Sequence, residues 1–187
     1  MKFEGVSKIH EGKFLTRYDL KYVTEDGKDK VYEMVSRNKD LKTLEDVQNK
    51  GIDAVVLIIW NESHDSILID REFRPAAGQE VYNFPAGLIE KGESVEEAAA
   101  RELKEETGLT LTKIEGYLSP CFSAVSFANE KNVCVIGTAA GDFAPSSSSF
   151  EEIKAGWYTK EEVRELLQNK LFTARTQTWC YLWVNGF

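Results

Sequence analysis

The chain of 187 residues predicts a mixed α+β fold. Short apolar or alternating runs, typical of strands, are interleaved with about three helical segments. Two of these helices begin at capping boxes, Ser94 to Glu97 and Thr159 to Glu162, in which a hydroxyl and a carboxylate three residues apart satisfy the first backbone N–H groups. This length corresponds to one domain, with room for a small appendage.

The first ~40 residues predict a β-hairpin, because apolar and polar side chains alternate around a turn at 25–27. The alternating positions are Phe14, Thr16, Tyr18, Leu20 and Tyr22 against Arg17, Asp19 and Lys21. We therefore expect a β extension at 1–40 and the main domain at 41–187. Such a hairpin would expose an apolar strand edge, so the sequence predicts a homodimer in which the extension packs against the partner or swaps onto it.

The main domain is expected to alternate between strands and helices. The expected elements are a short helix at 41–47, strands at 54–60, 67–69 and 81–84, a helix from Ser94 to the glycine at 108, strands near 111–118 and 132–138, a mobile loop at 141–149, a strand at 153–158, and helices at 159–168 and 172–183.

The helix that begins at Ser94 carries three carboxylates whose spacing indicates chemistry. Glu102, Glu105 and Glu106 stand at i, i+3 and i+4, which places them on one side of a helix. At about 100° per residue, Glu102 and Glu106 fall inside the apolar stripe and Glu105 borders it. The apolar stripe consists of Val95, Ala98, Ala99 and Leu103.

Glutamates on a helix are usually solvated, but clustered carboxylates on a buried face repel each other and require a cation. Their oxygens are hard ligands that suit divalent metal ions. Arg101, one turn before Glu105, can orient it through an i,i+4 ion pair. The sequence therefore predicts a metal platform on this helix.

Composition excludes several classes of partner. A net charge of −8 and a pI near 5.0 argue against a nucleic-acid backbone, whereas metal ions can still bring phosphates to an acidic protein. The N-terminus has no apolar core of a signal peptide, and the longest apolar run, 54–60, is too short to span a membrane. Cys121, Cys134 and Cys180 fit neither a zinc site nor a disulfide framework, which favours reduced core cysteines and a cytoplasmic location.

The stretch from Gly87 to Leu109, GLIEKGESVEEAAARELKEETGL, matches the Nudix box at every position. REFRP at 71–75 and VYNFPAGLIEKGES at 81–94 resemble the ADP-ribose pyrophosphatase branch of the Nudix hydrolases, as do the N-terminal hairpin and the GWYTKEEV run near 156–163. The resemblance implies the Nudix fold, a mixed β-sheet between helices in which the box presents the metals.

The resemblance also implies a role for each matching residue. Mg²⁺ or Mn²⁺ would bind Glu102, Glu105, Glu106 and the carbonyl of Ala86. Glu93 and Arg101 would brace the loop against the helix, while Gly87 and Gly108 would permit its two turns. Arg71 or Arg74, with Arg74 preferred, would pair with the pyrophosphate or the terminal ribose.

Three departures leave the substrate and the general base open. Asn83 stands where the branch commonly has Glu, and the loop at 119–130 is longer than usual and lacks its glycine. In the late loop the nearby carboxylates are Glu151 and Glu152, either of which would be a ligand or the base. The candidate catalytic residues are Glu105, Glu106, Glu151 and Glu152.

These features favour a Mg²⁺-dependent hydrolase that converts ADP-ribose to AMP and ribose 5-phosphate. Another sugar nucleotide or a dinucleotide is the alternative within the same class. A non-catalytic ligand-sensing Nudix module would usually carry a degraded box and a DNA-binding domain, whereas this chain has an intact box and no room for a basic helix-turn-helix. Isomerase chemistry on isopentenyl diphosphate would need a catalytic cysteine, for which Cys121 is the candidate.

Overall fold

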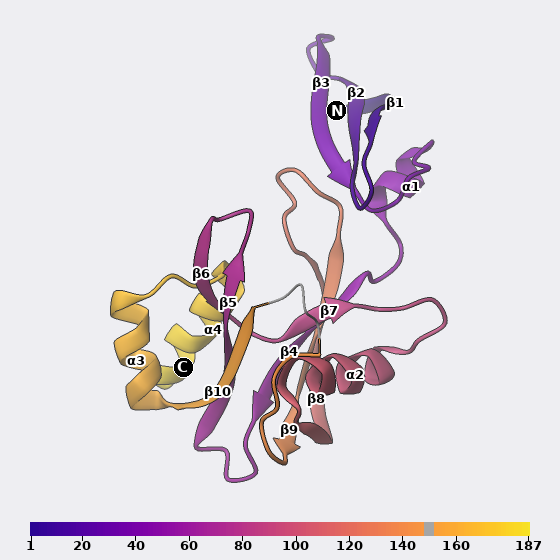
Figure 1. The fold of residues 1–187 in the computed structure, drawn as a ribbon. Coiled ribbons are helices and arrows are strands. Elements are labelled where there is room, and N and C mark those ends of the chain that lie inside the picture. The colour runs from indigo at the N-terminus through magenta and orange to yellow at the C-terminus, as the bar shows by residue number, and fades with distance from the viewer. Residues whose placement is uncertain (148–151) are drawn as a thin grey trace. The chain divides into compact units, whose positions relative to one another are not determined.

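The computed structural model describes residues 1–147 and 152–187 (Figure 1). The chain divides into two compact units. The small unit contains Met1–Ala54 and Pro120–Asn132, and the large unit contains Val55–Ser119 and Val133–Phe187. This division assigns residues 41–54 and 120–132 to the small unit, while a functional boundary after residue 40 stays a prediction.

The small unit is built on a three-stranded antiparallel sheet in the order β1-β2-β3, followed by a short helix. The elements are β1 (Lys2–Glu11), β2 (Thr16–Val23), β3 (Asp29–Ser36) and α1 (Leu44–Gln48). The predicted hairpin is β2–β3, and Gly27 in its turn has a φ of 79°. Strand β1 was not predicted, because none of its ten residues is buried and its sequence lacks a clear apolar alternation.

The core of the small unit lies against this sheet and is formed by buried Tyr18, Leu20, Met34 and Leu41. Residues 120–132 join the unit through backbone bonds, since the N–H of Val35 donates to the carbonyl of Phe127 at 2.8 Å. Two segments that lie far apart in the chain therefore form one compact body.

The large unit is built on a seven-stranded sheet with the path β10-β5-β4-β9-β8, in which β6 pairs with β5 and β7 with β4. The strands are β4 (Ala54–Trp60), β5 (Ser66–Arg74), β6 (Gln79–Asn83), β7 (Ala86–Leu88), β8 (Thr110–Phe122), β9 (Lys131–Ala140) and β10 (Ile153–Thr159), and the helices are α2 (Val95–Thr107), α3 (Lys160–Asn169) and α4 (Ala174–Asn185). The α+β prediction is confirmed. Strand β7 was not predicted, because three residues carry no periodicity.

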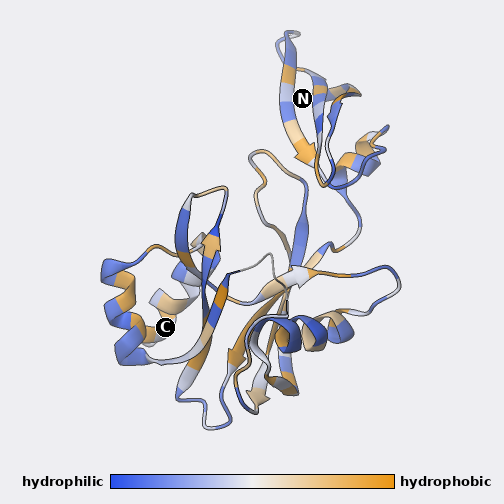
Figure 2. Ribbon diagram, viewed as in Figure 1, coloured by the Kyte–Doolittle hydropathy of each residue, from blue (hydrophilic) through white to orange (hydrophobic). Residues whose placement is uncertain are grey.

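Strand β4 contributes to the core on both of its faces, because alternate residues point in opposite directions. Val56 and Ile58 pack with Val163 of α3 and Cys180 of α4. Val55, Leu57 and Ile59 are also fully buried, so the other face of the strand is covered as well. Figure 2 shows hydrophobic residues along the strands of the seven-stranded sheet, whereas the visible side of α2 is hydrophilic.

Within the described ranges, none of the helices has the length and apolar character needed to cross a membrane. Cys134 and Cys180 are buried, as expected for core cysteines, whereas Cys121 is exposed. Cys121 is therefore not a core cysteine, and its thiol lies 3.3 Å from Oδ1 of Asn132.

Candidate active site

Helix α2 begins and ends where its capping residues predict. The Ser94 hydroxyl accepts the N–H of Glu97, and the Glu97 carboxylate accepts the N–H of Ser94 at 2.8 Å. Gly108 follows the last turn with a φ of 81°, in the left-handed region. A Cβ at Gly108 would also lie 2.5 Å from the backbone nitrogen of Ala144, so this position needs glycine for two independent reasons.

The three carboxylates of α2 differ in burial as their helical phase predicts. Glu106 is buried, with 8% of the residue exposed. The side chain of Glu102 is 12% exposed, and that of Glu105, at the border of the apolar stripe, is 49% exposed. Two carboxylates therefore lie inside the protein and one lies at its surface.

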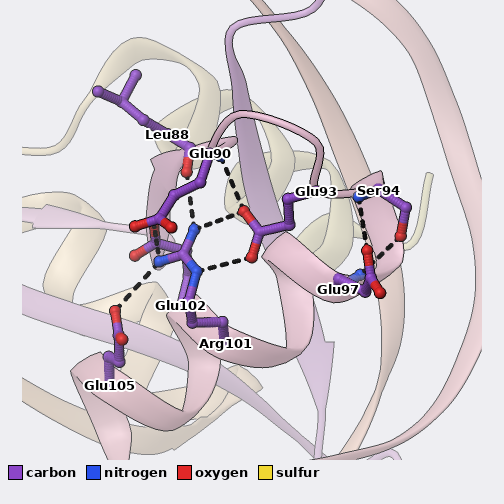
Figure 3. Close-up of polar contacts among 8 residues, drawn as sticks. All are labelled: Leu88, Glu90, Glu93, Ser94, Glu97, Arg101, Glu102 and Glu105. Atoms are coloured by element: carbon purple, nitrogen blue, oxygen red, sulfur yellow. Dashed lines mark hydrogen bonds and ion pairs between the residues drawn. The ribbon is translucent and has the colours of Figure 1, made fainter.

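Arg101 connects these carboxylates to the loop that precedes the helix (Figure 3). Its Nε and Nη2 donate to the two oxygens of Glu93 at 2.7 and 2.9 Å. Nη2 also donates to the carbonyl of Leu88 at 2.9 Å, and Nη1 donates to Glu102 at 2.9 Å and to Glu105 at 3.1 Å. A guanidinium has five N–H groups, and these contacts use all five.

This arrangement keeps Glu93 ionised. The hydrogen bonds from Arg101, and then the backbone N–H of Glu90, lower the pKa of Glu93 to about 2. The same contact with Glu93 raises the pKa of Arg101, so the guanidinium stays charged at any physiological pH. Because Glu102 and Glu105 bind the same nitrogen of Arg101, the guanidinium also gathers two of the predicted metal ligands.

The first two residues of β7, Ala86 and Gly87, contact the carboxylates of Glu106 and Glu102. The N–H of Ala86 donates to Oε2 of Glu106 at 3.1 Å. A Cβ at Gly87 would lie 1.9 to 2.2 Å from the carboxylate atoms of Glu102, so any other residue here would displace this carboxylate from its position. The backbone of β7 therefore lies directly beside the carboxylates, as a metal-binding carbonyl would require.

The chemistry of these groups fits Mg²⁺ or Mn²⁺, because carboxylate and backbone oxygens are the ligands that both ions prefer. Within the described residues, no group of three or more His, Cys, Asp or Glu side chains is arranged so that it could hold a metal ion. Glu102 and Glu105 both accept hydrogen bonds from Nη1 of Arg101 (Figure 3).

The segment after β9 lies against the C-terminal end of α2. The N–H groups of Ala144 and Ser147 donate to the carbonyls of Thr107 and Glu105, both at 2.9 Å. The predicted residue Glu151 lies outside the described residues. Glu152 is exposed, and its carbonyl accepts the N–H of Phe73 at the end of β5 at 3.3 Å.

The two predicted substrate arginines both lie on β5 and have different partners. Arg74 forms a 2.7 Å ion pair with Glu72, whose side chain is only 9% exposed. Arg71 is paired with Glu80 across the β5–β6 ladder at 3.4 Å. A buried carboxylate therefore holds Arg74, which sequence reasoning preferred, in a defined position.

Asp70, also on β5, was missed by the sequence reasoning. It is 2% exposed, and its Oδ1 is buried without a hydrogen-bond partner among the described residues. Burial raises the pKa of Asp70 well above its usual range, Glu72 raises it further, and Arg74 opposes the shift. The signal in the sequence was a carboxylate directly after the apolar run Ile67–Ile69.

Residues 50–180 match the NUDIX domain model. The chain belongs to the Nudix family. The model covers the carboxylate helix, the loop at Ala86 and the arginines of β5, so every described residue of the predicted site lies within the family domain.

Relatives with assigned names support the resemblance to the ADP-ribose pyrophosphatase branch. The chain is 33% identical to a mouse ADP-sugar pyrophosphatase over 117 residues, which is 63% of this chain and 50% of the relative. It is 37% identical to a yeast (Saccharomyces cerevisiae) ADP-ribose pyrophosphatase over 87 residues, 46% of this chain and 37% of the relative. The matched regions thus span about half or less of these two relatives.

The chain is similar in structure to a solved crystal structure of an ADP compounds hydrolase, with a TM-score of 0.69 and 23% sequence identity. The match covers 100% of this chain and 96% of the chain in that structure. At this identity the likeness concerns the fold, and it confirms the predicted Nudix architecture.

Proposed function

We propose that this Nudix protein is a divalent-metal-dependent pyrophosphatase that hydrolyses ADP-ribose to AMP and ribose 5-phosphate. The observation that carries the proposal is the pair of buried carboxylates, Glu102 and Glu106, which lie against the backbone at Gly87 and Ala86. Carboxylates in such a position are stabilised by a cation. The ADP-sugar and ADP-ribose pyrophosphatases among the relatives support the choice of substrate.

In this proposal Mg²⁺ or Mn²⁺ is held by Glu102, Glu105, Glu106 and the carbonyl of Ala86. Bound metal would neutralise the pyrophosphate charge and lower the pKa of a coordinated water. Arg101 and Glu93 keep the helix and the preceding loop in register through their paired hydrogen bonds. Arg74, oriented by Glu72, pairs with a phosphate oxygen or the terminal ribose of the substrate.

One carboxylate must accept the proton of the attacking water. The candidates are Glu105, Glu106, Glu151 and Glu152. Glu152 is supported by its position beside Phe73, one residue from Arg74. Glu105 is supported by its greater exposure on α2.

A substrate screen tests the proposal. Purified protein with Mg²⁺ is offered ADP-ribose, other ADP-linked and sugar nucleotides, dinucleotides and nucleoside triphosphates, and phosphate is measured after phosphatase treatment. We expect ADP-ribose to be hydrolysed best and triphosphates at least about tenfold more slowly, a difference of about 1.4 kcal/mol in transition-state free energy. Faster hydrolysis of triphosphates than of every ADP-linked sugar would refute the substrate assignment.

We further propose a cytoplasmic homodimer in which residues 1–40 pack against the partner. Within the described residues, Cys121 and Cys180 form no disulfide, which agrees with a reducing compartment. Large apolar side chains of the small unit are solvent-exposed, among them Phe14 at 68%, Val125 at 69% and Phe127 at 56%. Light scattering at micromolar concentration should give the mass of a dimer, and a monomer there would remove the idea.

A further inference from the structure

We infer that Thr176, a buried threonine of α4, is a positioning residue for the loop that carries Ala86. The inference rests on the proposed function, because Ala86 and Glu106 belong to the proposed metal site. Thr176 lies outside the Nudix box, in a helix that the sequence motifs do not connect with metal binding, and the residue is fully buried.

The contacts of Thr176 join α4 to the end of β6. Its hydroxyl oxygen accepts the backbone N–H of Phe84 at 3.0 Å and its hydroxyl proton points to Oδ1 of Asn83 at 3.2 Å. The hydroxyl of Thr173 donates to the same oxygen of Asn83 at 2.7 Å. Oδ1 of Asn83 thus lies within hydrogen-bond distance of two hydroxyls, that of Thr176 in α4 and that of Thr173, the N-cap residue of this helix.

The loop after Asn83 is held at three consecutive residues by three different elements. The hydroxyl oxygen of Thr176 in α4 accepts the N–H of Phe84, and the carbonyl of Pro85 accepts the N–H of Leu57 in β4 at 2.8 Å. The N–H of Ala86 then reaches Glu106 of α2 at 3.1 Å. Releasing the first of these contacts lets the backbone move two residues before Ala86.

The N-terminus of α4 supplies an independent argument. Thr173 is its N-cap residue, yet its side chain makes no capping hydrogen bond to the helix. An N-cap hydroxyl typically stabilises its own helix by about 1 kcal/mol. In this protein the hydroxyl lies 2.7 Å from Oδ1 of Asn83 and 3.0 Å from the hydroxyl of Thr176, so the polar side chains at this helix end contact the segment at 83–86.

The test compares Thr176→Val, which removes the hydroxyl and keeps the shape, with Thr176→Ser, which keeps the hydroxyl. Thr178→Val is the control, because Thr178 is exposed on the same helix and, among the described residues, its hydroxyl bonds only to the carbonyl of Ala174. Mg²⁺ binding is measured by calorimetry, and amide exchange of Phe84 and Ala86 by NMR.

We expect Thr176→Val to weaken Mg²⁺ binding about tenfold, the lower end of what outer contacts of metal ligands contribute. Exchange at Phe84 and Ala86 should accelerate in this variant, while Thr176→Ser and Thr178→Val behave as wild type. Should Thr176→Val fail to fold, Thr173→Val removes the second hydroxyl at a half-buried position and should change both readouts in the same direction.

Unchanged Mg²⁺ affinity and unchanged exchange in Thr176→Val would overturn the inference, and so would a Thr176→Ser variant as damaged as Thr176→Val. The exchange measurement needs neither substrate nor turnover. If the wild-type protein hydrolyses none of the nucleotides, the proposed function fails, while the exchange rates still decide whether Thr176 positions Ala86.

Discussion

Within the large unit, Glu93 beside Arg101 of α2 and Asp70 on β5 have pKa values that are shifted in opposite directions. Arg101 uses every N–H of its guanidinium, and its partner Glu93 has a pKa of about 2. Asp70 is more deeply buried, has an oxygen without a hydrogen-bond partner among the described residues, and has a raised pKa. Hydrogen-bond donors aimed at a carboxylate therefore decide whether it stays charged when it is removed from water.

The difference corresponds to what each region is proposed to do. Beside Arg101, Glu93 has a lowered pKa and remains ionised, and the same guanidinium binds Glu102 and Glu105 of the proposed cation site. On β5 the raised pKa of Asp70 favours its neutral form, while Glu72 makes the 2.7 Å ion pair with Arg74. Three experiments can break or sharpen this comparison.

The largest effect is expected from Glu106→Gln, which should lower the rate of hydrolysis about 100-fold or more. Gln keeps an oxygen that can accept the N–H of Ala86, so the fold should remain intact and the apo protein should be equally or more stable. Steady-state kinetics, Mg²⁺ titration and thermal melts measure the three quantities.

A matched control is Glu165→Gln, because Glu165 is exposed on α3. Glu96 on α2 is less suitable, since it accepts a 2.6 Å hydrogen bond from Tyr117. Wild-type turnover in Glu106→Gln, or equal loss in Glu165→Gln, would contradict the assignment of α2 as the metal platform.

An intermediate effect is expected from Arg101→Lys, which should reduce activity about tenfold and lower the melting temperature. Lysine keeps the charge but cannot supply five N–H groups in a planar fork, so Glu93 and Leu88 cannot both remain bonded as they are. Kinetics and thermal melts at pH 7 test this, with Arg175→Lys as the control, since Arg175 makes no ion pair among the described residues. Equal activity of both variants would show that charge alone is sufficient at position 101.

The smallest effects concern the pH dependence of stability. Ionised Glu93 should stabilise the fold, whereas ionised Asp70 should destabilise it. Ionised Glu93 has a pKa below its ordinary value of 4.5, so its stabilisation is present above about pH 4.5 and is lost as the pH falls toward 2. Ionised Asp70 has a raised pKa, so its destabilisation is present at high pH and is relieved as the pH falls through its folded-state pKa.

Thermal melts of Glu93→Gln and Asp70→Asn between about pH 2 and 8 measure this difference, because the contribution of Glu93 changes only below about pH 4.5. At pH 8, Glu93→Gln should melt below wild type and Asp70→Asn about 2–4 °C above it. Both differences should shrink on acidification. A lower melting temperature for Asp70→Asn at pH 8 would mean that ionised Asp70 stabilises the fold, and the comparison would then be wrong.

The sequence by itself determined the features that depend on near neighbours. The ends of α2, the greater burial of Glu102 and Glu106 than of Glu105, and the Arg101–Glu105 ion pair all follow from helical periodicity and capping chemistry. These contacts join residues at most four positions apart, and the geometry of one helix specifies them.

Only the tertiary structure decided the contacts between distant elements. Thr176 meets the N–H of Phe84 across 92 positions of sequence, and β1 pairs with β2 although its own pattern predicts no strand. The protonation of Asp70 depends on how much water the packing of β5 excludes and on the nearby charges of Glu72 and Arg74. Desolvation and long-range hydrogen bonds exist only after elements have packed together, so no local pattern in the chain encodes them.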